Sequence, residues 1–314
     1  AMNTDIQTAT AGNLSHLVDI YEAIEYFIKQ DDCKESSKRL YRKTLRLFFE
    51  WVEKENKDIA TLSKVDIVEY KEHLQGRGLS SLSVSSYLTS LRKFYEWAES
   101  ERLSPNIVKG VKTPRRVQQF KKQHLTEKKS KELLQYFESV SKRDFAIINL
   151  LLRTGLRTIE VVRADVGDIT FKNGRRILKV WGKGKDNKDD FVILTDKAFQ
   201  PIAEYLKTRG QVKENEPLFT STSHRNNGER LTTRTISGIC KQGLRAIGLD
   251  AREFTAHSLR HTTATMILKH GGQLTDAQNV LRHASPNTTQ IYIESIKEDL
   301  RIRRAPEQRL DAIF

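Results

Sequence analysis

Arginine and histidine stand close together in the segment Ala256–His261, which reads AHSLRH. On a helix, His257 and Arg260 lie three positions apart and share a face. The planar guanidinium of arginine makes two parallel, charge-assisted hydrogen bonds to a phosphate and keeps its proton at physiological pH. Cleavage of a phosphodiester needs neutralised non-bridging oxygens, a nucleophile and an acid that protonates the departing oxygen. The segment therefore indicates a site for phosphate chemistry.

A metal site is the alternative interpretation of the same histidines. His257 and His261 have the i, i+4 spacing of a zinc pair, but no glutamate follows the first histidine as in the H-E-x-x-H motif. The cysteines Cys33 and Cys240 lie far apart and form no C-x-x-C motif, which argues against a disulfide framework or a cysteine zinc site. We therefore expect no bound metal and two free thiols.

Four segments in order resemble the motifs of the tyrosine site-specific recombinases, the integrase family. Thr154–Glu160, TGLRTIE, resembles their first box T-G-L-R-x-x-E, and His257–His261 resembles their H-x-L-R-H box. Leu281–His283, followed nine residues later by Tyr292, resembles their third box and nucleophile. Lys183, between two glycines, stands where the family carries its hairpin lysine. The resemblance is closest to the Xer and integron-like branch and extends over nearly the whole chain.

The resemblance implies a mechanism without ATP, metal or other cofactor. Tyr292 is expected to attack the scissile phosphate and form a 3′-phosphotyrosyl link while the 5′ oxygen leaves. Arg157 and Arg260 are expected to clamp the non-bridging oxygens. His257 and His283 are expected to donate further hydrogen bonds to the phosphate, and Lys183 is expected to protonate the leaving oxygen. A buried Glu160 is expected to support Arg157. His261 is expected to lie behind the reacting groups.

Two positions depart from the family pattern. The loop after Gly184 is about two residues longer than usual and acidic, which leaves Lys185 and Lys188 as rivals of Lys183 for the general acid. Arg282 stands where a glycine usually precedes the third-box histidine. Two other functions also remain open, a type IB topoisomerase with the same chemistry and a DNA-binding regulator without catalysis.

Composition predicts two domains with different charge. The chain has 314 residues, 38% of them hydrophobic, and a net charge of +14, which is typical of proteins that meet a polyanion. Residues 1–114 hold 17 basic and 17 acidic residues, whereas residues 115–314 hold 37 basic and 23 acidic ones. Proline, glycine and basic residues mark the boundary. We expect a helical DNA-binding domain at 1–114, a linker at 115–124 and a catalytic domain at 125–314.

The periodicity of apolar residues predicts the elements that position these side chains. Four helices are expected between about residues 14 and 101, one of them capped by Ser63 and Asp66. The catalytic domain is expected to be mixed α/β, mainly helical around a small antiparallel sheet. Its three strands are predicted at 169–172, 177–181 and 191–194, the first two joined by an Asn173-Gly174 turn. The resemblance implies that the two domains form a C-shaped clamp on DNA.

The expected partner is double-stranded DNA that carries a specific core site. The resemblance further implies a homotetramer. The tail, residues 296–314, ends in the apolar residues Leu310, Ala312, Ile313 and Phe314, and we expect this end to dock on a neighbouring protomer or on its own domain. No apolar run reaches the roughly 20 residues that span a bilayer, so we expect a cytoplasmic protein without membrane contact. The basic candidates for DNA contacts are Lys38, Arg42, Arg46, Lys121, Lys122, Arg234 and Lys241.

Overall fold

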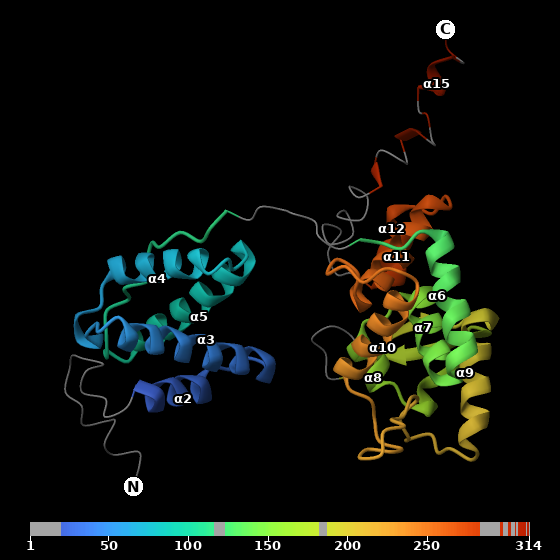
Figure 1. Cartoon of the computed structure of the whole chain (residues 1–314), viewed down its shortest axis with the longest axis horizontal. Helices are drawn as coiled ribbons and strands as arrows, with labels where there is room; N and C mark the ends of the chain where they lie inside the picture. The colour runs from blue at the N-terminus through green and yellow to red at the C-terminus, as the bar shows by residue number, and fades with distance from the viewer. Residues whose placement is uncertain are drawn as a thin grey trace. The chain divides into compact units, whose positions relative to one another are not determined.

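The computed structural model forms two units, which contacts between residues divide at position 119 (Figure 1). We name them the N-terminal unit, residues 1–119, and the C-terminal unit, residues 120–314. The residues that the structure describes are 20–115, 123–181, 187–282, 296–297, 301–302, 305, 307–311 and 313.

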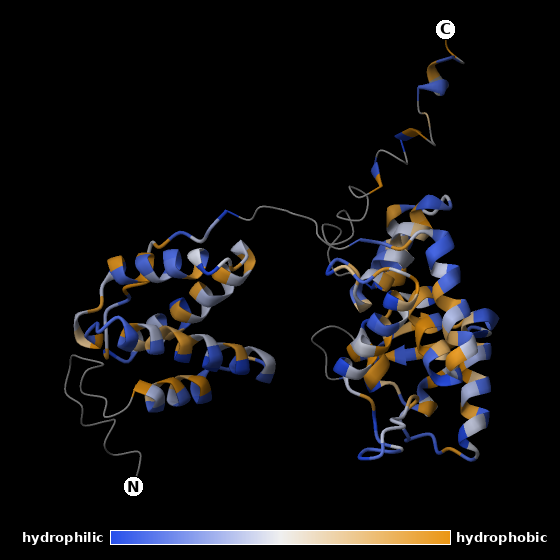
Figure 2. Ribbon diagram, viewed as in Figure 1, coloured by the Kyte–Doolittle hydropathy of each residue, from blue (hydrophilic) through white to orange (hydrophobic). Residues whose placement is uncertain are grey.

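Residues 20–115, the described part of the N-terminal unit, form a bundle of four α-helices, as the apolar spacing predicts. The helices pack their apolar sides against one another, as the orange faces in Figure 2 show. Aromatic rings fill much of the core. Phe48 stacks on Trp51 and contacts Tyr70 edge to face. The elements are α2 (Ile20–Gln30), α3 (Glu35–Lys54), the 3-10 helix η2 (Ile59–Thr61), α4 (Lys64–Gly76) and α5 (Ser81–Ser100).

The predicted cap of α4 is confirmed. Ser63 accepts a hydrogen bond from the Val65 backbone, and the Asp66 carboxylate accepts one from the Ser63 backbone N–H at 2.8 Å. These bonds satisfy donors that the first turn of a helix leaves without an intrahelical partner. A local sequence pattern thus determines where this helix begins.

The C-terminal unit surrounds a small sheet with helices. Its central helix is α7 (Lys142–Thr154), which contacts α6 (Glu127–Val140), α9 (Asp196–Arg209) and α11 (Ala256–Lys269) (Figure 1). Residues on all sides of α7 are buried, as expected of a helix that is apolar around its circumference. The other elements are α8 (Thr158–Arg163), η3 (Val166–Asp168), β1 (Ile169–Lys172), β2 (Arg175–Val180), β3 (Asp190–Ile193), α10 (Thr233–Ala246), α12 (Leu274–Leu281) and α15 (Gln308–Asp311).

The three strands form an antiparallel sheet in the order β1-β2-β3, as predicted. Asn173 and Gly174 both have positive φ, 48° and 74°, as a type I′ hairpin turn requires. Lys172 pairs directly with Arg175, so β2 begins two residues earlier than the apolar pattern suggested. The tight turn, rather than side-chain hydropathy, decides where this strand starts.

Both cysteines are free thiols, as expected. Cys240 is fully buried in the C-terminal unit, and this burial raises the pKa of its thiol to about 12. A thiol with so high a pKa stays protonated at neutral pH and is inert. Among the described residues, no helix combines the length and hydropathy needed to cross a membrane.

Gly243 tests the packing of α10 on α6. A Cβ at this position would collide with the ring of Phe137 and lie 2.7 Å from Leu133. We expect Gly243→Ala to lower the free energy of unfolding by about 1–3 kcal/mol, because overpacking outweighs the gain in helix propensity. Urea unfolding of the full chain, followed by circular dichroism, measures the change.

Gly238 on the same helix is the matched control, since a Cβ there meets nothing within 4 Å. Gly238→Ala is expected to stabilise the protein by roughly 0.5–1 kcal/mol through helix propensity alone. Equal effects of the two alanines would contradict the predicted collision.

Candidate active site

A pocket of about 380 Å³ in the C-terminal unit brings together three of the predicted catalytic residues. Arg157 comes from the start of α8, and His257 and Arg260 come from the first turns of α11, about 100 positions later in the chain. The full lining is Leu156, Arg157, Thr158, Ile159, Ser237, Thr255, Ala256, His257 and Arg260. The two boxes thus converge on one site, as the resemblance implies.

Gly155 sets the direction in which the chain enters this pocket. It ends α7 in the left-handed conformation, with φ 60° and ψ 25°, which glycine adopts without steric cost. A Cβ at this position would also lie 2.5 Å from the Leu281 side chain. The glycine of the first box is therefore required both by the backbone conformation and by the close approach of α12.

Glu160 holds the first-box arginine. Its carboxylate accepts hydrogen bonds from the Arg157 backbone N–H at 2.6 Å and from Arg157 Nη1 at 2.9 Å. Glu160 is buried, whereas the Arg157 side chain remains 30% exposed. A buried carboxylate that is bonded on one side of a guanidinium fixes its orientation and leaves the other donors available to a ligand.

Arg260 is a buried cation that connects distant segments. Its guanidinium donates hydrogen bonds to the backbone carbonyls of Gly155 and Leu281. These carbonyls belong to the turn after α7 and to the end of α12. Arg260, in the H-x-L-R-H box, therefore connects the first box at Gly155 with the third box at Leu281.

The N-terminus of α11 adds to the positive potential of the pocket. Thr255 caps this helix together with Ser258, whose hydroxyl accepts a hydrogen bond from the Thr255 backbone at 3.0 Å. His257 is exposed in the first turn and lines the pocket. The backbone N–H groups at the start of a helix attract anions, so the pocket suits a phosphate.

His261 lies on another side of α11. It is buried, its ring contacts the ring of His124 at a centroid distance of 5.6 Å, and it does not line the pocket. The place of His261 behind the reacting groups stays a prediction. The other predicted site residues Lys121, Lys122, Lys183, His283 and Tyr292, and the rival Lys185, lie outside the described residues.

Lys188, the other rival for the general acid, is held by two carboxylates. Its ammonium lies 2.7 Å from Asp165 and 2.6 Å from Asp168. Burial of the ammonium opposes its charged form, but the bonds to both aspartates outweigh burial and raise the pKa of Lys188. A raised pKa makes proton donation less favourable.

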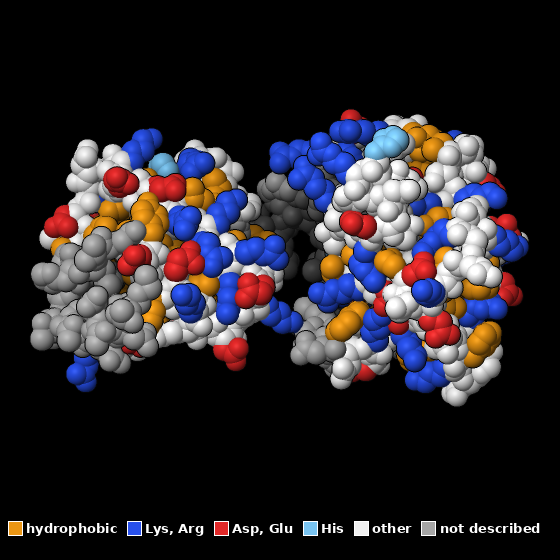
Figure 3. Space-filling model, turned by 90° about the horizontal axis from the view of Figure 1, so that it is seen from below, with side chains coloured by type: hydrophobic (Ala, Val, Ile, Leu, Met, Phe, Trp, Pro, Cys, Tyr) orange, Lys and Arg blue, Asp and Glu red, His pale blue; other side chains and the backbone are white. Residues whose placement is uncertain are grey.

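The candidates for DNA contacts in the N-terminal unit form ion pairs within the protein. Arg42 makes a forked ion pair with Glu25, at 2.7 and 2.8 Å, and Arg46 contacts the same carboxylate at 3.4 Å. The Arg42 guanidinium is the main cause that lowers the pKa of Glu25. Lys38 lies 3.8 Å from Glu35. Figure 3 shows other Lys and Arg side chains interspersed with Asp and Glu over the visible face of each unit.

In the C-terminal unit, Lys241 donates hydrogen bonds to the carbonyls of Asp250 and Ala251, and so fixes the loop before α11. Arg234 is exposed in the first turn of α10. Of these two candidates, Arg234 is the better placed for contact with a ligand.

Sequence reasoning missed the hydroxyl groups of the pocket. Thr158, Ser237 and Thr255 line it beside the arginines and the histidine. Thr158 lies within the first box and Thr255 stands two residues before His257, so their positions were a usable signal. Ser237 comes from α10, which carries no motif, and only the packing of α10 on α8 brings it there.

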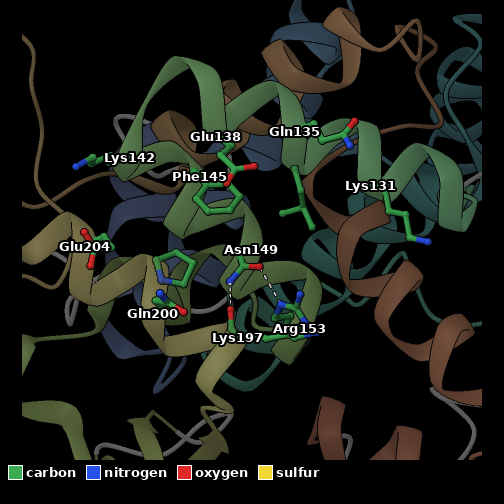
Figure 4. A pocket seen from close by; sticks show the side chains of 12 residues that line it. Lys131, Gln135, Glu138, Lys142, Phe145, Asn149, Arg153, Lys197, Gln200 and Glu204 are labelled. Atoms are coloured by element: carbon green, nitrogen blue, oxygen red, sulfur yellow. Dashed lines mark hydrogen bonds between the residues drawn. The ribbon is translucent and has the colours of Figure 1, made fainter.

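A larger pocket, of about 590 Å³, lies between α6, α7 and α9, and none of the predicted residues lines it (Figure 4). Asn149 spans this pocket: it donates to the Lys197 carbonyl and accepts from Arg153, both at 2.9 Å. The bond to the Lys197 carbonyl joins α7 to α9, whereas the bond from Arg153 lies within α7. Two glutamates and four basic residues line this pocket, whereas no acidic residue lines the smaller one.

Comparison with known proteins finds relatives of both units. Residues 123–299 match the Phage integrase family, and residues 22–102 match the phage integrase N-terminal SAM-like domain. Tyrosine recombinase XerC of Leptospira interrogans is 30% identical over 290 residues, which cover 88% of this chain and 89% of that protein. Tyrosine recombinase XerA of Pyrococcus furiosus is 29% identical and covers 86% of this chain and 88% of its own length.

Solved structures have the same fold. The XerH site-specific recombinase in a post-cleavage complex with palindromic difH substrate superposes with a TM-score of 0.72 at 22% identity, over 90% of this chain and 83% of that chain. At this identity the likeness establishes the fold. The mainly helical catalytic domain with a small antiparallel sheet is therefore confirmed.

Arg260→Lys tests the cross-link that Arg260 makes. A single ammonium cannot reach both carbonyls in the geometry of the guanidinium fork, so one buried acceptor loses its partner. We expect the free energy of unfolding to fall by about 1.5–3 kcal/mol, measured by urea unfolding. Arg245→Lys, at a side chain that is 63% exposed, is the control and should change it by less than about 0.5 kcal/mol. Indistinguishable unfolding curves for the two variants would contradict the cross-link.

Proposed function

This chain belongs to the phage integrase family and is a tyrosine recombinase, and we propose that Arg157, His257 and Arg260 bind the scissile phosphate that its Tyr292 attacks. The chain cleaves and rejoins DNA in site-specific recombination. The observation that carries the assignment of residues is the pocket in which the two arginines and the histidine meet. The proposed roles of Lys183 and His283 rest on the order of the motifs.

The proposed reaction conserves bond energy in a covalent intermediate. The Tyr292 oxygen forms a bond to phosphorus while the bond from phosphorus to the 5′ oxygen breaks. The tyrosine proton passes to a neighbouring base, for which His283 is the candidate, and Lys183 protonates the departing 5′ oxygen. A 5′ hydroxyl of the partner strand then attacks the phosphotyrosine and releases Tyr292. No cofactor enters this scheme.

Electrostatics explain the need for two arginines and a helix terminus. A free tyrosine has a pKa near 10, so it is mostly protonated at neutral pH and needs nearby positive charge to react. The charge on the phosphorane oxygens grows in the transition state, and donors fixed in advance stabilise it without reorganisation. The bonds of Arg157 to Glu160, and of Arg260 to two carbonyls, supply this fixed geometry.

We propose the domain bounds 1–114 for DNA binding, 115–124 for the linker and 125–314 for catalysis. The partner is double-stranded DNA with a specific core site, on which four copies assemble and two domains of each close as a clamp. A similar structure, that of a lambda integrase dimer bound to a COC′ core site, supports a DNA-bound oligomer. Phosphate contacts make binding salt-sensitive. A cytoplasmic location agrees with this substrate.

The described residues of the tail differ in their burial. Ile296 is buried against α11 and α12, whereas Leu310 and Ile313 near the end are exposed. This division supports docking of the first part on its own domain and of the apolar end on a neighbouring protomer.

The rival functions are less well supported. A type IB topoisomerase relaxes supercoils as a monomer and yields no recombinant product, and a non-catalytic regulator needs no nucleophile. The family match and the Xer recombinases among the relatives favour recombination over both.

Tyr292→Phe tests the nucleophile. On a nicked duplex that lets the cleaved end diffuse away, the wild-type chain should form a covalent protein–DNA adduct that denaturing electrophoresis detects. The phenylalanine variant lacks the attacking oxygen and should form none. Adduct formation by this variant would reject Tyr292, and its DNA affinity, measured at equal salt, should match that of the wild type.

Lys183→Ala tests the general acid. Its cleavage rate should fall by roughly 10²–10⁴-fold, since that is the usual contribution of a positioned acid. A 5′-thio leaving group needs no proton and should restore the rate. Lys188→Ala should stay within about threefold of the wild-type rate, because Asp165 and Asp168 already engage that ammonium. Thio rescue of Lys188→Ala, or of Lys185→Ala, but not of Lys183→Ala would move the role to that lysine.

A further inference from the structure

Arg282 occupies a backbone position that favours glycine. It follows α12 in the left-handed conformation, with φ 54° and ψ 49°. An L side chain is strained there, because its Cβ approaches the following carbonyl oxygen. The local backbone therefore keeps the glycine-like conformation although the residue is arginine. A strained residue persists only where its surroundings hold it in place.

The Arg282 side chain is held by groups from three segments. It is only 6% exposed. Its Nη2 donates to Glu160 of α8 at 2.8 Å, and its Nη1 donates to the Val280 carbonyl of α12 at 3.0 Å. Its Nε lies 3.4 Å from Asp190, the first residue of β3, in an ion pair whose geometry is not that of a hydrogen bond. A buried arginine with two carboxylates is built into the site.

Glu160 is the group that connects Arg282 to the phosphate pocket. One of its oxygens, Oε2, accepts both from Arg282 and from the Arg157 backbone, while Oε1 accepts from Arg157 Nη1. A carboxylate between two guanidiniums is held on both sides, and its orientation determines that of Arg157. Loss of Arg282 would leave Glu160 with one guanidinium partner and freedom to rotate.

We propose that Arg282 is a positioning residue for strand cleavage, which acts through Glu160 on Arg157. This inference rests on the proposed function of the pocket. The same guanidinium joins three segments: α8 through Glu160, β3 through Asp190, and the end of α12 through the Val280 carbonyl. Arg260 bonds the carbonyl of Leu281, so two guanidiniums fix consecutive residues at the end of α12.

Arg282→Gly removes the guanidinium and keeps the backbone conformation, which glycine adopts without strain. The relief of strain opposes the loss of the ion pair, so the melting temperature should change little. The single-turnover cleavage rate at saturating DNA should fall on the order of 10-fold to 100-fold, since a misplaced clamp costs that much. The dissociation constant for the uncleaved duplex should stay within about twofold, because Arg282 does not line the pocket.

Arg102→Gly is the matched control. Arg102 is also an arginine in the left-handed conformation, with φ 59°, but it is exposed at the end of α5. Its replacement makes the same chemical change outside the site, and the cleavage rate should equal that of the wild type. A rate loss in both variants would assign the effect to the backbone and overturn the proposal.

A double-mutant cycle with Glu160→Gln separates positioning from stability. If Arg282 acts through Glu160, the two substitutions together should slow cleavage hardly more than Glu160→Gln alone. Multiplied losses, or wild-type cleavage by Arg282→Gly, would reject the proposal while the function stands. Should Arg282→Gly fail to fold, Arg282→Lys decides: a rate loss of about tenfold in the folded variant supports positioning, and the wild-type rate rejects it. Absence of an adduct from the wild-type chain would reject the proposed function itself, and this inference with it.

Discussion

The buried guanidinium of Arg260 must find its acceptors within the protein, because an uncompensated buried charge costs about 3–5 kcal/mol. It finds them in the carbonyls of Gly155 and Leu281, at the ends of two helices that lie far apart in the chain. Both carbonyls are left without an intrahelical partner where a helix ends, so one arginine satisfies both. Through these two bonds, Arg260 of the H-x-L-R-H box connects the first box at Gly155 with the third box at Leu281. The geometry of the pocket depends on this connection.

Around this cross-link, the site concentrates positive charge at a place for one anion. Arg157 and Arg282 share the carboxylate of Glu160, which neutralises part of their charge and fixes both. The exposed part of Arg157, the N-terminus of α11 and His257 remain directed at the pocket. In the proposed function, the scissile phosphodiester brings negative charge to this pocket, which no acidic residue lines. Fixed donors of this kind stabilise the charge that develops in a transition state more than they stabilise the ground state of the substrate.

The chain just before β3 is also fixed by ion pairs. Lys188 bonds Asp165 and Asp168 next to η3, and Arg230 also pairs with Asp165. These bonds, together with those to Arg230, lower the pKa of Asp165 against the effect of its burial. Lys188, two residues before β3, is therefore held against η3 and the residue before it.

The sequence by itself determined what depends on neighbours in the chain. The cap at Ser63, the turn at Asn173 and the boxes around Arg157 and Arg260 were all predictable, because each is set by a few adjacent side chains and backbone angles. The fold class and the family followed from their order. Only the tertiary structure decided that Ser237 reaches the pocket, that Lys188 is engaged by carboxylates, and that Arg282 shares Glu160 with Arg157. These contacts join residues separated by 20 to 122 positions, and the packing of helices and strands, which no local pattern encodes, brings them together.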